Sequence, residues 1–432
     1  MRLILENVGK VQTADIELNG ITVIAGENNT GKSTIGKMLF CIFSSFYRIE
    51  NQIDEERINT IGRHITNFYH ETFAFEHPAR RYSIRKLAEK FVYRKDEYLG
   101  DSRIIRKTIE EFFKSCEPNF DGVVHQDILE QLAERIYSVL DIDDIEIRKA
   151  ILKKRLNSEF GMKVGFLNGE DTGSKICLKI RDKQIGVEVL DNEKINILES
   201  MSLNKEIIYI DDPFVLDDLG SMVPYSFFFG QGHRGNLLEK LKRVKDTEDF
   251  GTLDELLVNK KLERILETMN GICDGDLLAS EEGSNYSYKT SELNGTLEMA
   301  NLSTGIKSFV ILKTLLKNGS IEENGVVILD EPEIHLHPEW QLRFAEVIVL
   351  IQKEFSVNIL LNTHSPYFLN AIEVYSKKYG IEEKCKFYLT DEVAGRTSIK
   401  DVTKKTELIY EKLARPLQDL ENLEYSDGNT IR

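Results

Sequence analysis

The sequence contains few of the features that mark secreted, metal-clustered or membrane-spanning proteins. Its 432 residues include only five cysteines, and no two of them form a Cys-x-x-Cys pair. This usage argues against a disulfide framework or a zinc cluster and is typical of a reducing compartment. No apolar run reaches the roughly 18 residues that a membrane-spanning helix needs, and the opening MRLILENVG does not resemble a signal peptide. We therefore expect a cytoplasmic protein without a membrane partner.

Positive charge is also scarce. The 72 acidic residues outnumber the 56 basic ones, and the net charge is −16. A protein that binds nucleic acid with its whole surface would not have this balance, so any such contact must come from a local basic patch. Because 41% of the residues are apolar, a sizeable core can form. The length suggests roughly two to three domains.

The stretch GENNTGKST, residues 26–34, has the glycine, lysine and hydroxyl spacing of a phosphate-binding P-loop. An apolar strand is expected over 21–25 and a helix over 33–43, which is the strand, loop and helix order that a P-loop requires. Lys32 would reach the β- and γ-phosphates, and Ser33 would bind magnesium. Backbone N–H groups would surround the phosphates. The predicted nucleotide-binding residues of this loop are Gly26, Asn28, Asn29, Thr30, Gly31, Lys32, Ser33 and Thr34.

A second motif, LDEPEIHLHP, follows a continuous apolar run at 326–329. Such a run is typical of a strand buried on both faces of a parallel sheet, and ligands bind at the carboxyl ends of such strands. Asp330 would hold Mg²⁺, directly or through water, and Glu331 would take a proton from the attacking water. ATP and Mg²⁺ are therefore the expected cofactors, and hydrolysis of ATP to ADP and phosphate is the expected reaction.

Two further motifs complete the predicted site. His364 follows an apolar strand expected at 359–361 and would donate a hydrogen bond to the γ-phosphate in a catalytic role. Ser303 and Thr304 are expected to cap a helix within 301–316. Ser303 and Gly305 would then form a second helix start that binds nucleotide. A histidine in an ordinary turn and an ordinary helix cap remain alternatives.

The order of these motifs resembles that of ABC-class ATPases, in particular the branch of RecF, the SMC proteins and the OLD-type ATPases of bacterial anti-phage defence. The resemblance covers about 1–45 and 200–400. It implies an α/β fold, an ABC-type P-loop NTPase head with a mixed or parallel sheet. It also implies a homodimer in which Ser303 and Gly305 of one copy close on the ATP held by Lys32 of the other. Residues 335–338 would signal across that interface.

The same resemblance, to the Septu, PARIS and retron-associated types of defence ATPase, implies a separate effector protein, a nuclease or a toxin. Two features depart from the family pattern. The signature usually contains a Gly-Gly pair followed by glutamine, whereas residues 304–307 read TGIK. The glutamine that normally binds magnesium has no obvious position, and Gln184 and Gln231 are candidates. Four aspartates follow the strand expected at 206–210, and either a metal cluster or a solvated strand end would explain them: Asp211, Asp212, Asp217 and Asp218.

The pattern changes outside the head, which is expected to comprise 1–45 and 201–400. Residues 46–200 are expected to form a mainly helical insertion with a β-hairpin that turns near Asp182. Residues 401–432 are expected to form a C-terminal helical tail. Pro416 would kink or break that tail helix, because proline removes a backbone donor.

A basic stretch with interleaved aromatic residues lies within 77–95. This combination suits nucleic-acid binding, although a plain solvated helix face would look the same. The alternative function is therefore a RecF- or SMC-like DNA-binding ATPase in repair or recombination. An ATP-assembled scaffold with negligible turnover is a further alternative. The residues that would contact nucleic acid are Arg80, Arg81, Arg85, Lys86, Lys90, Arg94 and Lys95.

Overall fold

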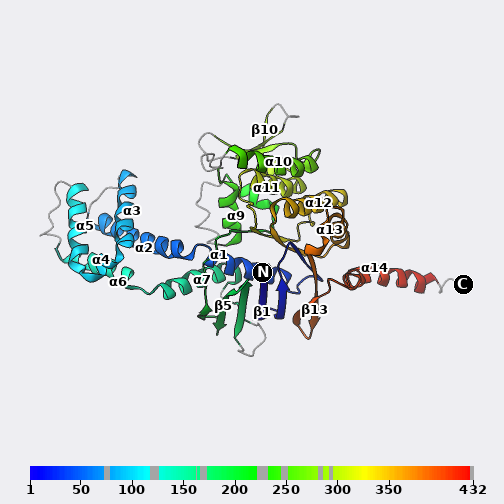
Figure 1. Ribbon diagram of the computed structural model, residues 1–432, viewed down its shortest axis with the longest axis horizontal. Helices are drawn as coiled ribbons and strands as arrows, with labels where there is room; N and C mark the ends of the chain where they lie inside the picture. Colours follow the sequence, from blue (N-terminus) through cyan, green and yellow to red (C-terminus); the bar gives the residue numbers. More distant parts are fainter. Residues whose placement is uncertain are drawn as a thin grey trace. The chain divides into compact units, whose positions relative to one another are not determined.

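The computed structural model describes residues 1–72, 78–116, 126–161, 163–165, 173–220, 232–244, 252–280, 286–290 and 295–428 (Figure 1). The chain folds into two compact units. Met1–Tyr47 and Leu152–Arg432 form the first, which we call the head. Arg48–Ile151 form the second, which we call the helical unit.

The described part of the head is built around an 11-stranded sheet with the order β6-β5-β4-β1-β2-β14-β13-β3-β12-β11-β7. Parallel pairing joins β13, β3, β12, β11 and β7, whereas β1, β2, β4, β5 and β6 pair antiparallel. The predicted α/β fold with a mixed sheet is thereby confirmed. Its strands are β1 (Arg2–Val8), β2 (Val11–Glu17), β3 (Ile21–Ala25), β4 (Ser174–Ile180), β5 (Lys183–Leu190), β6 (Lys194–Glu199), β7 (Ile207–Ile210), β11 (Val326–Asp330), β12 (Asn358–Thr363), β13 (Cys385–Val393) and β14 (Arg396–Asp401).

The central parallel strands are short and buried at every position of β3 and β11. Their side chains alternate between two hydrophobic clusters, one on each face of the sheet. In β11, Val327 and Leu329 belong to one cluster, and Val326 and Ile328 belong to the other. Burial on both faces explains why these strands are continuous apolar runs in the sequence.

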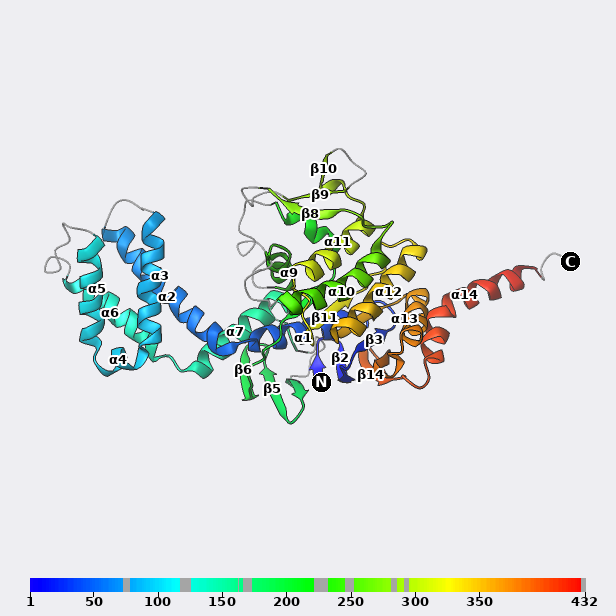
Figure 2. The same ribbon diagram turned by 45° about the horizontal axis from the view of Figure 1, so that its top comes forward.

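Helices cover both faces of the head sheet. One cluster packs under α1 (Lys32–Phe46). The other packs under a group of helices that lie together in Figure 2, namely α9 (His233–Leu241), α10 (Thr252–Met269), α11 (Thr304–Lys317), α12 (Pro338–Phe355) and α13 (Pro366–Lys378). The remaining short elements are η1 (Pro213–Asp218), η2 (Met299–Asn301), η3 (Glu382–Lys384) and a separate small sheet of β8 (Asp276–Ala279), β9 (Tyr286–Lys289) and β10 (Thr296–Glu298).

The hairpin expected inside the insertion belongs to the head sheet instead. Strands β4 and β5 pair from Ser174 with Val189 to Ile180 with Lys183, and β4 also pairs with β1. The compact helical unit therefore ends at Ile151, earlier than the boundary expected at residue 200. The physical reason is that β1 has a free edge, which β4 covers with main-chain hydrogen bonds.

Every described element of the helical unit is a helix. They are α2 (Ile49–Thr72), α3 (Pro78–Tyr93), α4 (Lys95–Gly100), α5 (Ser102–Cys116), α6 (Gln126–Asp141) and the first part of α7 (Asp144–Phe160), whose end lies in the head. Fully buried Ile61, Phe91 and Phe113 contribute to a core of their own. Arg57 is buried and pairs with Asp144 at 2.7 Å.

The C-terminal helix α14 (Glu407–Gly428) continues through Pro416. Of the two expected effects of this proline, a break in the helix is wrong, and a kink stays a prediction. Proline has a helical φ angle, so it removes one backbone hydrogen bond without preventing further turns. Within the described ranges, no helix is both long and apolar enough to cross a membrane.

Candidate active site

Three adjacent parallel strands bring the predicted motifs to one edge of the head sheet. The P-loop follows β3, the acidic pair ends β11, and His364 follows β12, which lies between the other two. The register places Asp330 beside Asn362 and Thr363 beside Ala25. The carboxyl ends of parallel strands are where such folds bind ligands.

The P-loop curls tightly because its glycines have no side chains. At Gly31, which precedes α1 and has a φ of +85°, an added Cβ would lie 2.8 Å from a methyl carbon of Val11. At Gly26, an added Cβ would lie 1.8 Å from the hydroxyl oxygen of Thr390. Asn28 and Asn29 are exposed at the tip, and Thr30 is buried, donating its hydroxyl to the Glu27 carbonyl at 2.8 Å.

Lys32 is buried and folds back over this loop. Its Nζ donates to the carbonyls of Gly26 at 3.0 Å and Glu27 at 2.8 Å. The same atom lies 3.4 Å from Oε1 of Glu331. A buried ammonium group needs such partners. The amine is therefore held at the mouth of the loop, where phosphate oxygens can replace the carbonyls.

Asp330 is held from two sides by neighbours that the sequence did not reveal. Its Oδ2 accepts a hydrogen bond from the Tyr209 hydroxyl at 2.8 Å, and its Oδ1 accepts one from Asn362 Nδ2 at 2.9 Å. Each carboxylate oxygen keeps further lone-pair capacity. Ser33, exposed at the start of α1, supplies a hydroxyl. These oxygen donors fit Mg²⁺, which prefers a few protein oxygens together with phosphate and water.

Glu331 has an unusual backbone conformation. Its φ is +49°, and its N–H donates to the Asn362 carbonyl at 2.9 Å, which holds the residue in place. Its Oε1 lies 3.4 Å from Nδ1 of His364 as well as 3.4 Å from Nζ of Lys32. Strained residues of this kind concentrate at functional sites because the surrounding structure must support them. The structure thus brings Lys32, Glu331 and His364 together.

Glu333 is a neighbour of His364 that the sequence gave no reason to select. Its side chain is 2% exposed, and its Oε1 accepts from the Thr363 hydroxyl at 2.5 Å and from the His364 N–H at 3.2 Å. Burial raises the pKa of Glu333 above its ordinary value. The signal available in the sequence was a glutamate three residues after a strand-end aspartate.

Ser303 and Gly305 have different surroundings. Ser303 is the residue before α11, as predicted, but its exposed side chain makes no capping hydrogen bond. An added Cβ at Gly305 would lie 3.0 Å from the Trp340 ring and 3.2 Å from the His335 carbonyl oxygen. These contacts join the start of α11 to the first turn of α12, through Trp340, and to His335 just before that helix.

The aspartates after β7 are ion-pair partners. Asp211 lies 3.0 Å from His233 Nε2, and Asp217 lies 2.6 Å from the buried Lys307 ammonium. Among the described residues, no group of three or more His, Cys, Asp or Glu side chains is arranged to hold a metal ion. The alternative of a solvated strand end is also incomplete, because Asp211 and Asp217 have ion-pair partners within the protein.

Of the two candidate glutamines, Gln184 does not reach the site. Gln184 lies on β5, with five strands between it and β3 in the sheet, and donates to Glu199 at 2.6 Å. Gln231 lies outside the described residues.

The basic stretch on α3 is partly neutralised. Arg85 pairs with Glu55 at 2.7 Å and with Glu89 at 3.0 Å. The Lys86 ammonium lies over the Tyr82 ring, 4.5 Å from its centroid, and that ring is 65% exposed. The side chains of Arg80 and Arg81 lie outside the described residues.

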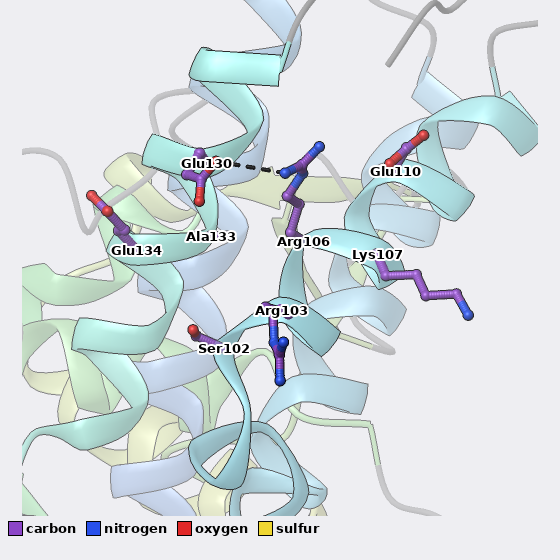
Figure 3. A pocket seen from close by; sticks show the side chains of 8 residues that line it. All are labelled: Ser102, Arg103, Arg106, Lys107, Glu110, Glu130, Ala133 and Glu134. Carbon is purple, nitrogen blue, oxygen red and sulfur yellow. Dashed lines mark ion pairs between the residues drawn. The ribbon is translucent and has the colours of Figure 1, made fainter. Parts of the chain in front are cut away.

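The helical unit also contains a cavity of about 320 Å³ between α5 and α6 (Figure 3). Arg106 faces Glu130 across it at 3.5 Å, and Arg103 pairs with Asp101 at 3.0 Å. The side chain of Lys107 points away from Glu130. Both arginines of this cavity therefore have a carboxylate partner.

Comparison with known proteins agrees with this geometry. A family profile described as AAA ATPase domain matches residues 1–369, a range that includes the P-loop, the acidic pair and His364. The chain belongs to the AAA ATPase domain family. Its head therefore carries the P-loop ATPase fold that the motifs predicted.

Relatives with more specific names are similar over shorter segments. The Septu protein PtuA of Bacillus thuringiensis is 29% identical over 147 residues, 31% of this chain and 36% of that protein. The "Retron Vc95 probable ATPase" of Vibrio cholerae is 23% identical over 211 residues, 45% of this chain and 40% of that protein. The chain thus spans less than half the length of these curated relatives. The predicted kinship with Septu and retron-associated ATPases is confirmed by these matches.

Among solved structures, the SMC head domain from Thermotoga maritima aligns with 93% of this chain and 98% of its own length. The identity is 12% and the TM-score is 0.38. The fold assignment rests on the sheet order and on the family match.

Proposed function

We propose that the protein binds ATP with Mg²⁺ at the P-loop and hydrolyses it to ADP and phosphate. The observation that carries this proposal is the meeting of Lys32, Glu331 and His364 within 3.4 Å contacts at the end of three parallel strands. Membership of an ATPase family and similarity to relatives named as ATPases support it.

The proposed mechanism consists of positioning and charge neutralisation, because phosphoryl transfer needs little covalent chemistry from the protein. Lys32 leaves its loop carbonyls for the β- and γ-phosphate oxygens. Glu331 accepts a proton from the attacking water, and His364 donates a hydrogen bond to the γ-phosphate. Ser33 and Asp330 would hold Mg²⁺, which supplies positive charge against the phosphates when bound.

We further propose that two copies pair around ATP. Ser303 is exposed, its side chain makes no capping hydrogen bond, and the atoms nearest to an added Cβ at Gly305 belong to Trp340 and His335. A second copy would therefore be needed to bring this helix start to the nucleotide. The Glu331-dependent step would separate the copies after hydrolysis.

The ATP cycle, in this proposal, controls a separate effector in anti-phage defence. The support is the similarity to the Septu protein PtuA and to retron-associated ATPases. The effector would be a nuclease or a toxin that responds to whether the two heads are joined.

The test is to measure phosphate release and molar mass for the purified protein with ATP and Mg²⁺. We expect hydrolysis and an ATP-dependent doubling of mass by light scattering. Proteins that copurify with a Glu331→Gln variant would be identified by mass spectrometry. A chain that neither binds nor hydrolyses ATP would refute the proposal.

The alternative is a DNA-binding ATPase of the RecF or SMC kind. The exposed Tyr82 ring beneath Lys86 on α3 favours it, because aromatic and basic side chains together suit single-stranded nucleic acid. It predicts that DNA stimulates hydrolysis and that the effect weakens steeply with salt. DNA-independent turnover would favour the effector-regulating function.

A further inference from the structure

A buried charged cluster lies behind the magnesium carboxylate. His233, the first residue of α9, is 7% exposed and has a carboxylate at each ring nitrogen. Its Nδ1 lies 2.7 Å from Oε2 of Glu159, and its Nε2 lies 3.0 Å from Oδ2 of Asp211. Glu159 also accepts the His233 backbone N–H at 2.6 Å, so both ends of the residue are fixed.

This cluster has a single favourable protonation state. Burial would lower the pKa of His233, but the carboxylates of Asp211 and Glu159 outweigh burial and raise the pKa to about 9. The ring is therefore an imidazolium at neutral pH, since removal of its proton would leave the buried Glu159 carboxylate and the partly buried Asp211 carboxylate facing a neutral ring. A charge held between two acids in this way cannot turn or shift without breaking an ion pair.

The imidazolium is stacked on the side chain that supports Asp330. The rings of His233 and Tyr209 have centroids 4.5 Å apart and are inclined by 28°, and Phe40 contacts both rings edge-on. The Tyr209 ring is fully buried, and its hydroxyl donates to Oδ2 of Asp330 at 2.8 Å. An unbroken series of contacts thus runs from His233 through Tyr209 to the carboxylate.

We propose that His233, locked between Glu159 and Asp211, is a positioning residue that fixes the Tyr209 hydroxyl and through it orients Asp330 for Mg²⁺. This inference rests on the proposed ATP-binding function. It assigns a role to four groups outside the motifs of the site, namely Glu159, Tyr209, Asp211 and His233. Glu159 brings the last turn of α7 into that role. Groups that hold a metal-binding carboxylate in place typically change metal affinity by about 10- to 100-fold when removed.

The first test removes only the Tyr209 hydroxyl. Binding of a fluorescent ATP analogue is measured with saturating Mg²⁺ and again with EDTA. The affinity in Mg²⁺ divided by the affinity in EDTA is the ratio that reports the contribution of the metal. Tyr209→Phe should lower this ratio about 10-fold while leaving the affinity in EDTA unchanged. The matched control is Tyr388→Phe. Tyr388 is also buried in the head sheet, but its hydroxyl accepts a hydrogen bond from the Glu17 N–H and makes none to Asp330. The control should keep the wild-type ratio.

The second test asks whether His233 acts through Tyr209. His233→Gln should lower the same ratio about 10-fold, and adding it to Tyr209→Phe should cause little further loss, because coupled residues are not additive. Glu159→Gln keeps the side-chain shape and removes one charge, so it should lower the ratio by a smaller factor. It serves as the readout if His233→Gln does not fold.

The outcomes separate the two proposals. A wild-type protein that binds no nucleotide, with or without Mg²⁺, would refute the proposed function itself. Wild-type binding that depends on Mg²⁺, with unchanged ratios in Tyr209→Phe or in both the His233 and Glu159 variants, would overturn only the positioning role. A fully additive double variant would also overturn it, because His233 would then act on the site by another route.

Discussion

Lys32 Nζ lies 3.4 Å from Glu331 Oε1, although one residue opens α1 near the start of the chain and the other follows β11 in its last third. The contact exists because β3 and β11 both flank β12 in the sheet. In this state the buried ammonium and the carboxylate partly neutralise each other. Nucleotide phosphates would compete for the ammonium and leave the carboxylate available to water.

Replacing Lys32 by alanine should weaken ATP binding by at least about 100-fold, because charge-assisted hydrogen bonds to phosphate are lost. Titration with a fluorescent ATP analogue measures the effect. Lys37→Ala is the matched control, since Lys37 lies farther along α1 and outside the predicted loop. Equal affinities in the two variants would contradict the role of Lys32.

Glu331→Gln should retain ATP binding but slow hydrolysis by about 100-fold or more, because an amide cannot accept the proton of the attacking water. The variant should accumulate as an ATP-bound dimer, detected by light scattering and by nucleotide retained after gel filtration. Glu382→Gln, an exposed change on η3, controls for loss of charge. An unchanged turnover rate in Glu331→Gln would remove this residue from the chemistry.

His364→Ala should lower kcat by about 100-fold, the usual loss when one donor to the developing phosphate charge is removed. The affinity for ATP should change much less, since the P-loop still holds the phosphates. Steady-state kinetics and binding titrations distinguish the two parameters. Should KM rise with kcat unaltered, His364 would be a binding or turn residue instead.

Gly305→Ala should destabilise the head by about 1–3 kcal/mol, because the new methyl group meets the Trp340 ring and the His335 carbonyl. It should also weaken ATP-dependent pairing, which light scattering would detect. Gly62→Ala is the control, since an added Cβ at Gly62 meets nothing within 4 Å. If the Gly305→Ala protein folds and still pairs normally with ATP, Gly305 has a role in packing only and does not contact the nucleotide of a second copy.

Stability should fall as the pH rises from about 6.5 to about 9. His233 has a pKa raised to about 9 in the folded protein, against an ordinary 6.5. The folded state therefore holds a proton that the unfolded state releases, and the contribution is complete below pH 6.5 and lost as the pH passes 9. The loss should not exceed about 3.4 kcal/mol.

Other charges around His233 do not reverse this trend. Burial would raise the pKa of Asp211, but His233 and Arg234 lower it to about 2, so this carboxylate is ionised over the range. The pKa of Tyr209 is raised by burial and by the nearby Asp330 carboxylate. Urea denaturation at pH 6, 7.5 and 9 of the wild type and of His233→Gln would measure the difference. Identical pH slopes for the two proteins would contradict the assignment.

The structure brings the predicted Lys32, Glu331 and His364 together, whereas its two compact units differ from the predicted domain boundaries. Glycine spacing, strand-end acids and apolar runs are local signals, so Lys32, Asp330 and Glu331 were recognisable before any fold was known. The assignment of residues 174–199 was not local. Those strands could form a hairpin anywhere. The pairing of β4 with β1, from Arg2 opposite Lys179 to Glu6 opposite Lys175, attaches them to the head sheet.

The side chains that hold the motif residues in place could not be predicted from the sequence either. Tyr209 precedes an acidic pair, Asn362 precedes a threonine, and His233 opens a helix after a glycine, and none of these patterns is specific. Their contacts with Asp330 or with each other depend on which strands are neighbours. Buried polar groups find partners across the sheet, and sequence distance does not limit that choice.

The sequence by itself determined that this chain carries a P-loop, a strand-end acidic pair and a following histidine, because backbone curvature and short apolar strands are local properties of residue type. Only the tertiary structure decided that these groups meet, with Lys32 Nζ and His364 Nδ1 each 3.4 Å from Oε1 of Glu331. The physical reason is the strand order β3-β12-β11, which main-chain hydrogen bonds and burial of both sheet faces fix together.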